Sequence, residues 1–273
     1  LVKEIDALGG QMGINTDKSG IQFKRLNSSK GPAVRSSRAQ CDKYIYAANM
    51  KEVIESTPNL TLLQREITQI KIEGGKVAAA ITSWGEEIKT HAVIITTGTF
   101  LGGLMHVGMQ NEKGGRAGDS ASYGLSTWLK DAGFRMMRLK TGTPPRLERR
   151  SIDFSKLEEQ WGDQPPSPFS FSMVGKQFPT LEQICCWITH TNSDTHGIIA
   201  DNFDRSPMFT GLIKGTGPRY CPSIEDKVKR FAEKDRHQIF LEPEGLQTKE
   251  IYATGLSTSL PLDVQLSFLK TIV

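Results

Sequence analysis

The sequence predicts an α/β fold, and three observations support this prediction. An uninterrupted apolar segment at residues 92–96 leads into the small-residue turn Thr97-Gly98-Thr99. This pattern is typical of a strand of a parallel sheet that is buried on both faces. Segments with helical spacing of apolar residues alternate with segments of strand-like alternation. The composition, 37% hydrophobic and 23% charged, is typical of a globular chain and not of a disordered one.

The composition also excludes several classes of protein. The formal charge is +4, from 34 basic and 30 acidic residues, which by itself is too small to indicate nucleic-acid binding. The apolar segments are far shorter than the ~20 residues that span a bilayer, and the N-terminal residues lack the pattern of a signal peptide. Four cysteines in 273 residues do not make a disulfide framework. We therefore expect a cytoplasmic protein without a membrane segment. Since the chain begins with Leu1 inside a helical pattern, we also expect it to be a piece of a longer protein.

Helices are predicted from the spacing of apolar residues and from residues that begin or end helices. Their ranges are residues 1–10, 33–55, 120–133 and 222–234. Gly9 should end the first of them, and Gly133 the third, because glycine accommodates the left-handed backbone that follows many helices. Ser120 is the expected N-cap of the third helix. Pro222 suits the first turn of the last one.

Strands are predicted where residues alternate or form short apolar runs. Their ranges are residues 67–72, 77–81, 87–90, 92–96, 134–139, 185–189 and 238–241. The turn at Gly74-Gly75 predicts that the first two form a β-hairpin. Residues 11–32 and 150–180 are rich in small, polar or proline residues, and we expect them to be mostly irregular. Residues 197–213 remain ambiguous.

Cys221 is the sharpest candidate for chemistry. It directly precedes Pro222 and the predicted helix, so the positive end of the helix dipole, together with Arg219 and Lys227, could stabilise a thiolate. A thiolate in this place is a good nucleophile. The alternative is a small residue that packs beside a turn, and the local sequence leaves both interpretations open.

The other cysteines and the histidines do not predict a metal site. Cys185 and Cys186 are adjacent, so on a strand they would face opposite sides, and neither belongs to a C-x-x-C pair. Cys41 is expected to pack against its neighbours. His190 and His196 lie in one loop-like region without a third ligand nearby. We therefore predict no metal.

Two further features could contact phosphate groups. Residues 24–43 carry one acid, Asp42, and six basic side chains: Lys24, Arg25, Lys30, Arg35, Arg38 and Lys43. With Tyr44 and Tyr46 following, this segment suits phosphate contacts and base stacking, whereas the alternative is a solvated surface helix. The glycine-rich residues 114–118 could bring backbone N–H groups to a phosphate, or they could form an ordinary loop.

The segment around Cys221, RYCPSIEDKVKRF preceded by Gly217-Pro218, closely resembles a signature of the MnmG (GidA) family of flavoproteins, which modify tRNA uridines. Further segments resemble the same family in the same order: LVKEIDALGG, SSKGPAVRSSRAQCDK, TTGTFLGG, GGRAGDSAS, RLKTGTPPRL, THTN and HQIFLEPEGL. The resemblance covers nearly the whole chain.

The resemblance implies part of a Rossmann-like FAD-binding domain with an inserted α/β domain that binds NADH. Residues 1–145 would be the partial FAD-binding domain with a basic insertion and a β-meander, residues 146–255 the inserted NAD-binding domain, and residues 256–273 the return toward the FAD-binding domain. The family's N-terminal G-x-G-x-x-G loop, its second catalytic cysteine and its helical C-terminal domain have no counterpart in this sequence. We therefore expect that this chain alone is inactive.

The resemblance also implies a reaction and its participants. The family uses FAD and NADH to add a carboxymethylaminomethyl or aminomethyl group to C5 of wobble uridine 34 in tRNA, with methylenetetrahydrofolate as the carbon donor. It works with an MnmE-type GTPase, and its members are typically homodimers.

Site residues follow from the matching motifs. Cys221 is implied as a catalytic cysteine, either as nucleophile or as the acid/base partner of the second cysteine. Ile67 and Ser122 are implied to contact FAD. Lys30, Arg35 and Arg38 would meet tRNA. The implied NAD-binding residues are Gly217, Pro218, Arg219, Tyr220, Cys221, Pro222, Ser223, Ile224, Glu225, Asp226, Lys227, Val228, Lys229, Arg230 and Phe231.

Two other functions remain open. One is an NADH-dependent flavin oxidoreductase without an RNA substrate, which would normally carry a redox-active cysteine pair that this sequence lacks. The other is a tRNA-binding scaffold without chemistry of its own. Salt-dependent binding of tRNA would separate the oxidoreductase from the other two.

Overall fold

The computed structural model describes residues 1–215 and 222–272. Its helices are α1 (Val2–Ala7), α2 (Gln11–Ser19), α3 (Lys43–Ser56), α4 (Gly124–Asp131), α5 (Ser193–Ala200), α6 (Ile224–Arg230) and α7 (Leu262–Leu269). Its strands are β1 (Gly20–Leu26), β2 (Ser36–Cys41), β3 (Ile67–Glu73), β4 (Lys76–Thr82), β5 (Glu87–Lys89), β6 (Leu104–Val107), β7 (Gln110–Lys113), β8 (Arg146–Glu148), β9 (Glu158–Gln160), β10 (Cys186–His190), β11 (Gln238–Pro243) and β12 (Glu250–Thr254). Short 3-10 helices lie at Pro32–Val34, Gly98–Phe100, Arg149–Ser151, Phe154–Lys156, Phe171–Met173 and Phe203–Arg205.

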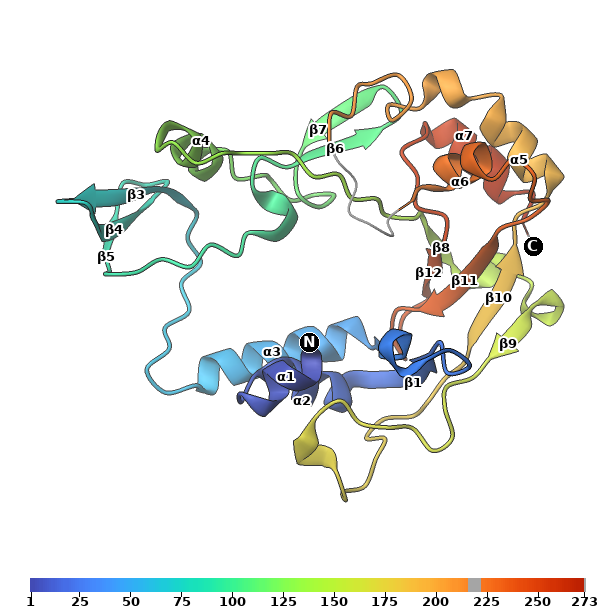
Figure 1. The fold of residues 1–273 in the computed structure, drawn as a ribbon, viewed down its shortest axis with the longest axis horizontal. Helices are drawn as coiled ribbons and strands as arrows, with labels where there is room; N and C mark the ends of the chain where they lie inside the picture. The colour runs from blue at the N-terminus through green and yellow to red at the C-terminus, as the bar shows by residue number, and fades with distance from the viewer. Residues whose placement is uncertain (216–221, 273) are drawn as a thin grey trace.

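The α/β class is confirmed, and the elements follow a ring in Figure 1. The N-terminal helices lie at the bottom of this view, and the extended residues 57–66 lead from α3 to β3. Within the described residues, no helix combines the length and the apolar character that crossing a membrane requires.

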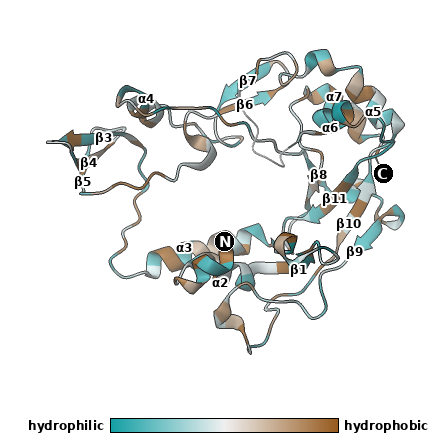
Figure 2. Cartoon of the chain, viewed as in Figure 1, coloured by the Kyte–Doolittle hydropathy of each residue, from teal (hydrophilic) through white to brown (hydrophobic). Residues whose placement is uncertain are grey.

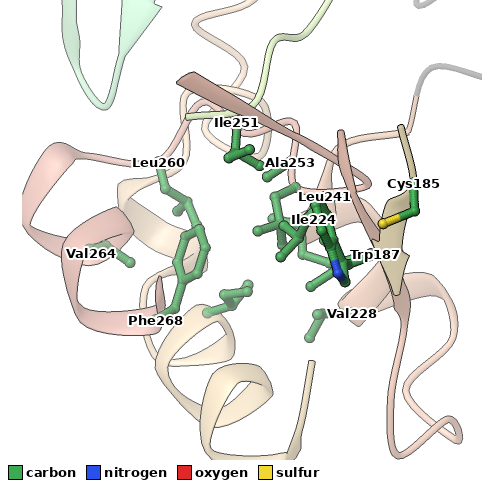
Figure 3. Close-up of a cluster of buried hydrophobic side chains, with 13 residues drawn as sticks. Cys185, Trp187, Ile224, Val228, Leu241, Ile251, Ala253, Leu260, Val264 and Phe268 are labelled. Carbon is green, nitrogen blue, oxygen red and sulfur yellow. The ribbon is translucent and has the colours of Figure 1, made fainter. Parts of the chain in front are cut away.

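The largest unit is a five-stranded antiparallel sheet in the order β8-β12-β11-β10-β9. Figure 2 shows hydrophobic residues along its central strands, β10 and β11. Helices α5, α6 and α7 add Ile199, Val228 and Phe268 to the same thirteen-residue buried core (Figure 3). We call the sheet with these three helices the sheet region. Each large apolar side chain buried in such a core contributes about 1.5–3 kcal/mol.

A hairpin of β1 and β2 and the helices α2 and α3 form a layer that attaches to the turn between β11 and β12. Asp42 caps α3 by accepting hydrogen bonds from the backbone N–H groups of Tyr44 and Ile45, and its other oxygen accepts the Leu246 N–H at 2.8 Å. A Cβ at Gly245 would lie 2.7 Å from the same oxygen. The cap of α3 therefore also fixes the turn of the sheet region, and this approach requires glycine.

The strands β3, β4 and β5 form a second antiparallel sheet, which packs against α4. We call these four elements the α4 region. Its buried hydrophobic cluster comprises Ile70, Leu125 and Leu129. The predicted hairpin across Gly74-Gly75 is confirmed, and both glycines have positive φ. Gly133, which was predicted to end this helix, has positive φ and lies two residues after the last residue of α4.

Two predicted strands are wrong. Residues 92–96 have no strand assignment, and the Ile94 side chain is 88% exposed. Residues 134–139 are also without a strand, and Leu139 is 73% exposed. Every ladder between named strands in the described residues is antiparallel. An apolar run can form a buried parallel strand only beside partner strands, and the described residues provide none there.

Three other expectations need correction. Residues 11–32, expected to be irregular, contain α2 and β1, where small polar residues such as Asn15 and Asp17 are buried and hydrogen-bonded. The helix predicted at residues 33–55 starts only at Lys43, because residues before the Asp42 cap form β2 instead. The predicted N-cap Ser120 lies outside α4, whose N-cap is Tyr123.

The helix predicted at residues 222–234 is shorter than expected, since α6 ends at Arg230. Its N-cap is Ser223, whose hydroxyl accepts the Asp226 N–H. The strands predicted at residues 185–189 and 238–241 are confirmed as β10 and β11, each within two residues of the expected bounds.

Candidate functional site

Two glycine-rich segments, residues 97–103 and 114–122, meet and form what we call the glycine-loop site. The Gly114 N–H donates to the Gly103 carbonyl at 3.2 Å, and Thr99 Oγ1 donates to the Gly115 carbonyl at 2.8 Å. A Cβ on Gly103 would lie 2.6 Å from the Thr99 carbonyl oxygen, and one on Gly115 would lie 2.7 Å from the Phe100 ring. Both glycines therefore allow the two segments to pack together, including Gly115, which lies in the segment predicted to contact a phosphate.

Ser122 lies where these two segments pair. Its N–H donates to the Phe100 carbonyl at 2.9 Å, and its carbonyl accepts the Gly102 N–H at 2.8 Å. Its hydroxyl is buried and has no hydrogen-bond partner in the part of the chain that the structure describes. A buried hydroxyl without a partner costs about 1–3 kcal/mol. Ser122 therefore offers a fixed, unused hydrogen-bonding group, which suits a bound cofactor.

Ile67 reaches the same junction from the α4 region. It is the first residue of β3 and is half-buried. The next residue, Thr68, packs so closely on the start of α4 that a Cβ on Gly124 would lie 2.8 Å from its Cβ. Ile67 directly precedes Thr68, and Ser122 lies two residues before Gly124, so both adjoin this contact in sequence. Their common assignment to FAD stays a prediction.

His106 and Arg138 lie beside this site and were missed by the sequence reasoning. The Arg138 guanidinium donates to the Gly102 carbonyl at 3.1 Å. Burial and the nearby Arg138 charge lower the pKa of His106, whose Nδ1 is buried without a partner among the described residues. No local motif marks either residue, because their contacts join segments more than 30 positions apart.

The predicted nicotinamide-binding segment lies only partly within the described residues. Gly217, Pro218, Arg219, Tyr220 and Cys221 fall outside them. In the described part, Ile224 and Val228 point into the core of the sheet region (Figure 3). Glu225 is fully buried, and its Oε1 accepts hydrogen bonds from the backbone N–H and the hydroxyl of Ser259, both at 3.0 Å. Ile224, Glu225 and Val228 therefore hold α6 in place, so not every residue of the predicted segment is available to contact a ligand.

The three cysteines within the described residues are poor nucleophiles. Burial raises the pKa of Cys41, Cys185 and Cys186, and for Cys186 the value reaches about 12. Each thiol therefore stays protonated at neutral pH, when it reacts slowly. No group of three or more potential metal ligands occurs in residues 1–215 and 222–272.

The three basic residues predicted to meet tRNA have different surroundings. Lys30 and Arg35 are exposed, and the Arg35 guanidinium donates to the Lys30 carbonyl at 2.8 Å. Arg38 instead forms an ion pair with the buried Glu242, which also accepts a hydrogen bond from Thr254 at 2.7 Å. Lys30 and Arg35 are therefore free to contact phosphates, whereas Arg38 also holds β2 to the sheet region.

The carboxylates of this interface were another feature that the sequence reasoning missed. Glu244 pairs with Lys43 and with Arg146, the latter at 2.9 Å, and Glu250 pairs with Lys43 at 2.6 Å. Lys43, first named only as part of a basic segment, is thus bound by two acids. The motif HQIFLEPEGL held the signal, since acids at the end of an apolar strand need a cation nearby.

Comparison with known proteins gives consistent matches along this chain. The model of the family described as Glucose inhibited division protein A matches residues 1–273. A crystal structure of GidA from Aquifex aeolicus, form I, is 52% identical, has a TM-score of 0.92 and covers 100% of this chain and 46% of that one. The form II structure is 50% identical, has a TM-score of 0.89 and covers 99% of this chain and 43% of that one.

The chain therefore has the α/β fold of the GidA structures. The chain belongs to the glucose inhibited division protein A (GidA) family. It spans a little under half the length of the GidA structures that it matches.

Proposed function

We propose that this chain is part of an FAD- and NADH-dependent enzyme that modifies wobble uridine 34 of tRNA. The observation that carries this proposal is the family match over residues 1–273, which includes the whole signature around Cys221. The expected product carries a carboxymethylaminomethyl or aminomethyl group on C5, with methylenetetrahydrofolate as the carbon donor. The same family assignment supports an MnmE-type GTPase partner, a homodimeric full-length protein and a cytoplasmic location.

In this proposal the glycine-loop site holds FAD, which supplies the redox chemistry when bound. The unpartnered Ser122 hydroxyl supports this assignment, because a hydrogen bond to a ligand would satisfy it. Ile67 adds an apolar contact from the start of β3. The nicotinamide cofactor would lie along residues 217–231, and the boundary at residue 145 would separate the two cofactor-binding units. The residues after the boundary at 255 stay with the second unit, because α7 packs in the core of the sheet region.

Cys221 would act directly on the substrate base. Its thiolate would add to C6 of uracil, which places electron density on C5. C5 would then form a bond to the methylene carbon of a folate-derived iminium, whose C=N π electrons pass to its nitrogen. Loss of the C5 proton and of the cysteine then restores the ring. The alternative role is that Cys221 carries the proton while a second cysteine adds to C6. The three described cysteines, all protonated at neutral pH, do not compete for either role.

Lys30 and Arg35 would contact the phosphates of tRNA, because both are exposed. Arg38 would contribute mainly through its ion pair with Glu242. Charge reversal at Arg35 should therefore weaken tRNA binding in a salt-dependent way without lowering the stability of the protein.

The test uses the intact protein in cells that lack their own copy, with nucleoside mass spectrometry of total tRNA. Cys221→Ser should abolish the modified wobble uridine. Cys41→Ser is the matched control, since this thiol is half-buried with a raised pKa, and it should leave modification unchanged. Wild-type modification by Cys221→Ser would contradict the catalytic role. Failure of the wild-type protein to restore any modification would favour an NADH-dependent flavin oxidoreductase without an RNA substrate.

A further inference from the structure

The turn of the β6–β7 hairpin contacts the sheet region through its backbone. Gly108 lies at this turn, and its N–H donates to the Ser259 carbonyl at 2.7 Å. Ser259 lies between β12 and α7, next to Leu260, which is buried in the core of the sheet region. Among the described residues, this is the one backbone hydrogen bond between residues 57–131 and residues 146–272. Figure 1 shows the hairpin between α4 and the helices α6 and α7.

The contact leaves no room for a side chain at Gly108. Its φ is +59°, and an added Cβ would lie 2.7 Å from Pro261 Cγ, closer than real Cβ atoms approach a neighbour. Other residues are strained at this φ, so both observations favour glycine. The turn of the hairpin therefore packs directly on the residues that precede α7.

Glu225 holds Ser259 from the side of α6. Glu225 is fully buried, and its Oε1 accepts both the backbone N–H and the hydroxyl of Ser259, each at 3.0 Å. Its Oε2 is buried without a hydrogen-bond partner in the part of the chain that the structure describes. Burying a carboxyl group is costly, and an apolar side chain of the same size would fill this space without that cost. What Glu225 adds is therefore its hold on Ser259.

The other end of the hairpin enters the glycine-loop site. Leu104 begins β6 directly after Gly103, and Lys113 ends β7 directly before Gly114. The two strands pair along their whole length, and the Gly114 N–H continues the pairing by donating to the Gly103 carbonyl. A displacement of the turn would therefore displace the glycine loops as well.

We propose that Glu225 is a positioning residue, which sets the glycine-loop site against the sheet region through Ser259 and the β6–β7 hairpin. Its consequence for the reaction rests on the proposed function, in which NADH on the sheet region gives a hydride to flavin at the glycine-loop site. The hydride carries two electrons and one proton, so the products are NAD⁺ and the reduced flavin anion. This transfer requires the two rings in contact, and a displacement of about 1 Å can slow such a step about 100-fold.

Hydrogen–deuterium exchange of the intact protein without NADH tests the contact itself. Glu225→Met removes the acceptor at similar size, and Gly108→Ala forces the turn away from its neighbours. In both variants the amides of residues 104–113 should exchange at least fivefold faster, while β10 and β11 keep their exchange rates. Glu225→Gln keeps an acceptor oxygen and should restore slow exchange. Glu112→Gln is the matched control, since this acid of β7 is exposed, and it should exchange as the wild type does.

Anaerobic stopped-flow reduction of the bound flavin by NADH tests the consequence. At saturating NADH, reduction should be at least tenfold slower in Glu225→Met and in Gly108→Ala, while flavin content and the Kd for NADH change less than twofold. A residue that only stabilised the fold would not divide rate from binding in this way. Gly108 lies outside the segment assigned to NADH, so its effect does not come from lost cofactor contacts. Because both variants act on one contact, the double variant should be no slower than the slower single one.

Three results would overturn the inference. Unchanged exchange of the hairpin in both variants would show that the contact does not hold it. Faster exchange with unchanged flavin reduction would leave Glu225 a structural role only. Losses that multiply in the double variant would show two separate effects. If NADH does not reduce the flavin of the wild-type protein, the proposed function fails, whereas the exchange of the hairpin still decides whether Glu225 positions it.

Discussion

The sheet region and the α4 region bury their apolar residues to very different extents. The core of the sheet region contains thirteen buried side chains, whereas the cluster of the α4 region contains three. Beside the α4 region, the large apolar residues Ile94 and Met137 are 88% and 68% exposed. Apolar residues thus predict that a segment would gain from burial, but they do not show which other segment would cover it. The exposed segments flank the glycine-loop site, where a cofactor would gain contacts.

The largest expected effect is the loss of a core side chain of the sheet region. Phe268 in α7 is fully buried, and Phe268→Ala should lower the free energy of unfolding by about 3–5 kcal/mol. Leu129→Ala in the α4 region should cost less, about 2 kcal/mol, because the smaller cluster can relax around the cavity. Urea denaturation of both variants measures the difference. Equal costs would contradict the contrast between the two regions.

The second effect concerns the attachment of β2 to the sheet region. Arg38→Ala removes the cation beside the buried Glu242, and we expect a loss of about 2 kcal/mol, because an uncompensated carboxylate remains. Arg150→Ala is the control, since its pair with Glu148 is exposed and should be worth less than about 1 kcal/mol. A neutral Arg38→Ala variant would show that this ion pair does not hold the layer.

Acid should weaken the sheet region through His237. Burial lowers its pKa in the folded protein, so the unfolded chain binds more protons below the ordinary histidine pKa. The free energy of unfolding should therefore fall as the pH drops below about 6.5, with a slope of at most about 1.4 kcal/mol per pH unit from this group. His237→Gln should reduce that slope in urea denaturation at pH 5–7. An unchanged slope would contradict the lowered pKa.

Ser122→Ala should have the smallest effect on stability. Because its hydroxyl has no partner among the described residues, its removal should leave the free energy of unfolding unchanged or raise it by up to about 1 kcal/mol in the flavin-free protein. Thermal denaturation without flavin measures this change. A loss of more than 1 kcal/mol would indicate that the hydroxyl has a structural partner.

The sequence predicted those elements that local residues determine, and it failed for elements that depend on pairing with a distant segment. The hairpin of β3 and β4 and the strand β11 were predicted well, because turn residues and local apolar patterns determine them. Residues 92–96 were wrongly predicted as a strand, since no periodicity reveals whether a partner strand is available. The early start predicted for α3 had a similar cause: β2 exists through its pairing with β1, which local sequence does not show.

The candidate sites show the same limit. Motifs identified Ser122 and Lys227, and they identified Cys221, which lies outside the described residues. They did not show that His237 meets His196, although His196 was weighed as a metal ligand with His190. That contact joins residues 41 positions apart in sequence through Thr191 and the β10–β11 pairing, so only the folded chain reveals it.

The central proposal is that the glycine-loop site binds flavin while the sheet region binds the nicotinamide cofactor. The most direct measurement compares flavin content, from absorbance near 450 nm, and NADH affinity, from titration, in intact Ser122→Ala and Lys227→Met proteins. We predict that Ser122→Ala loses flavin and keeps its affinity for NADH, while Lys227→Met keeps flavin and binds NADH at least tenfold more weakly. Loss of both cofactors in either variant, or of neither in both, would contradict the assignment of one cofactor to each region.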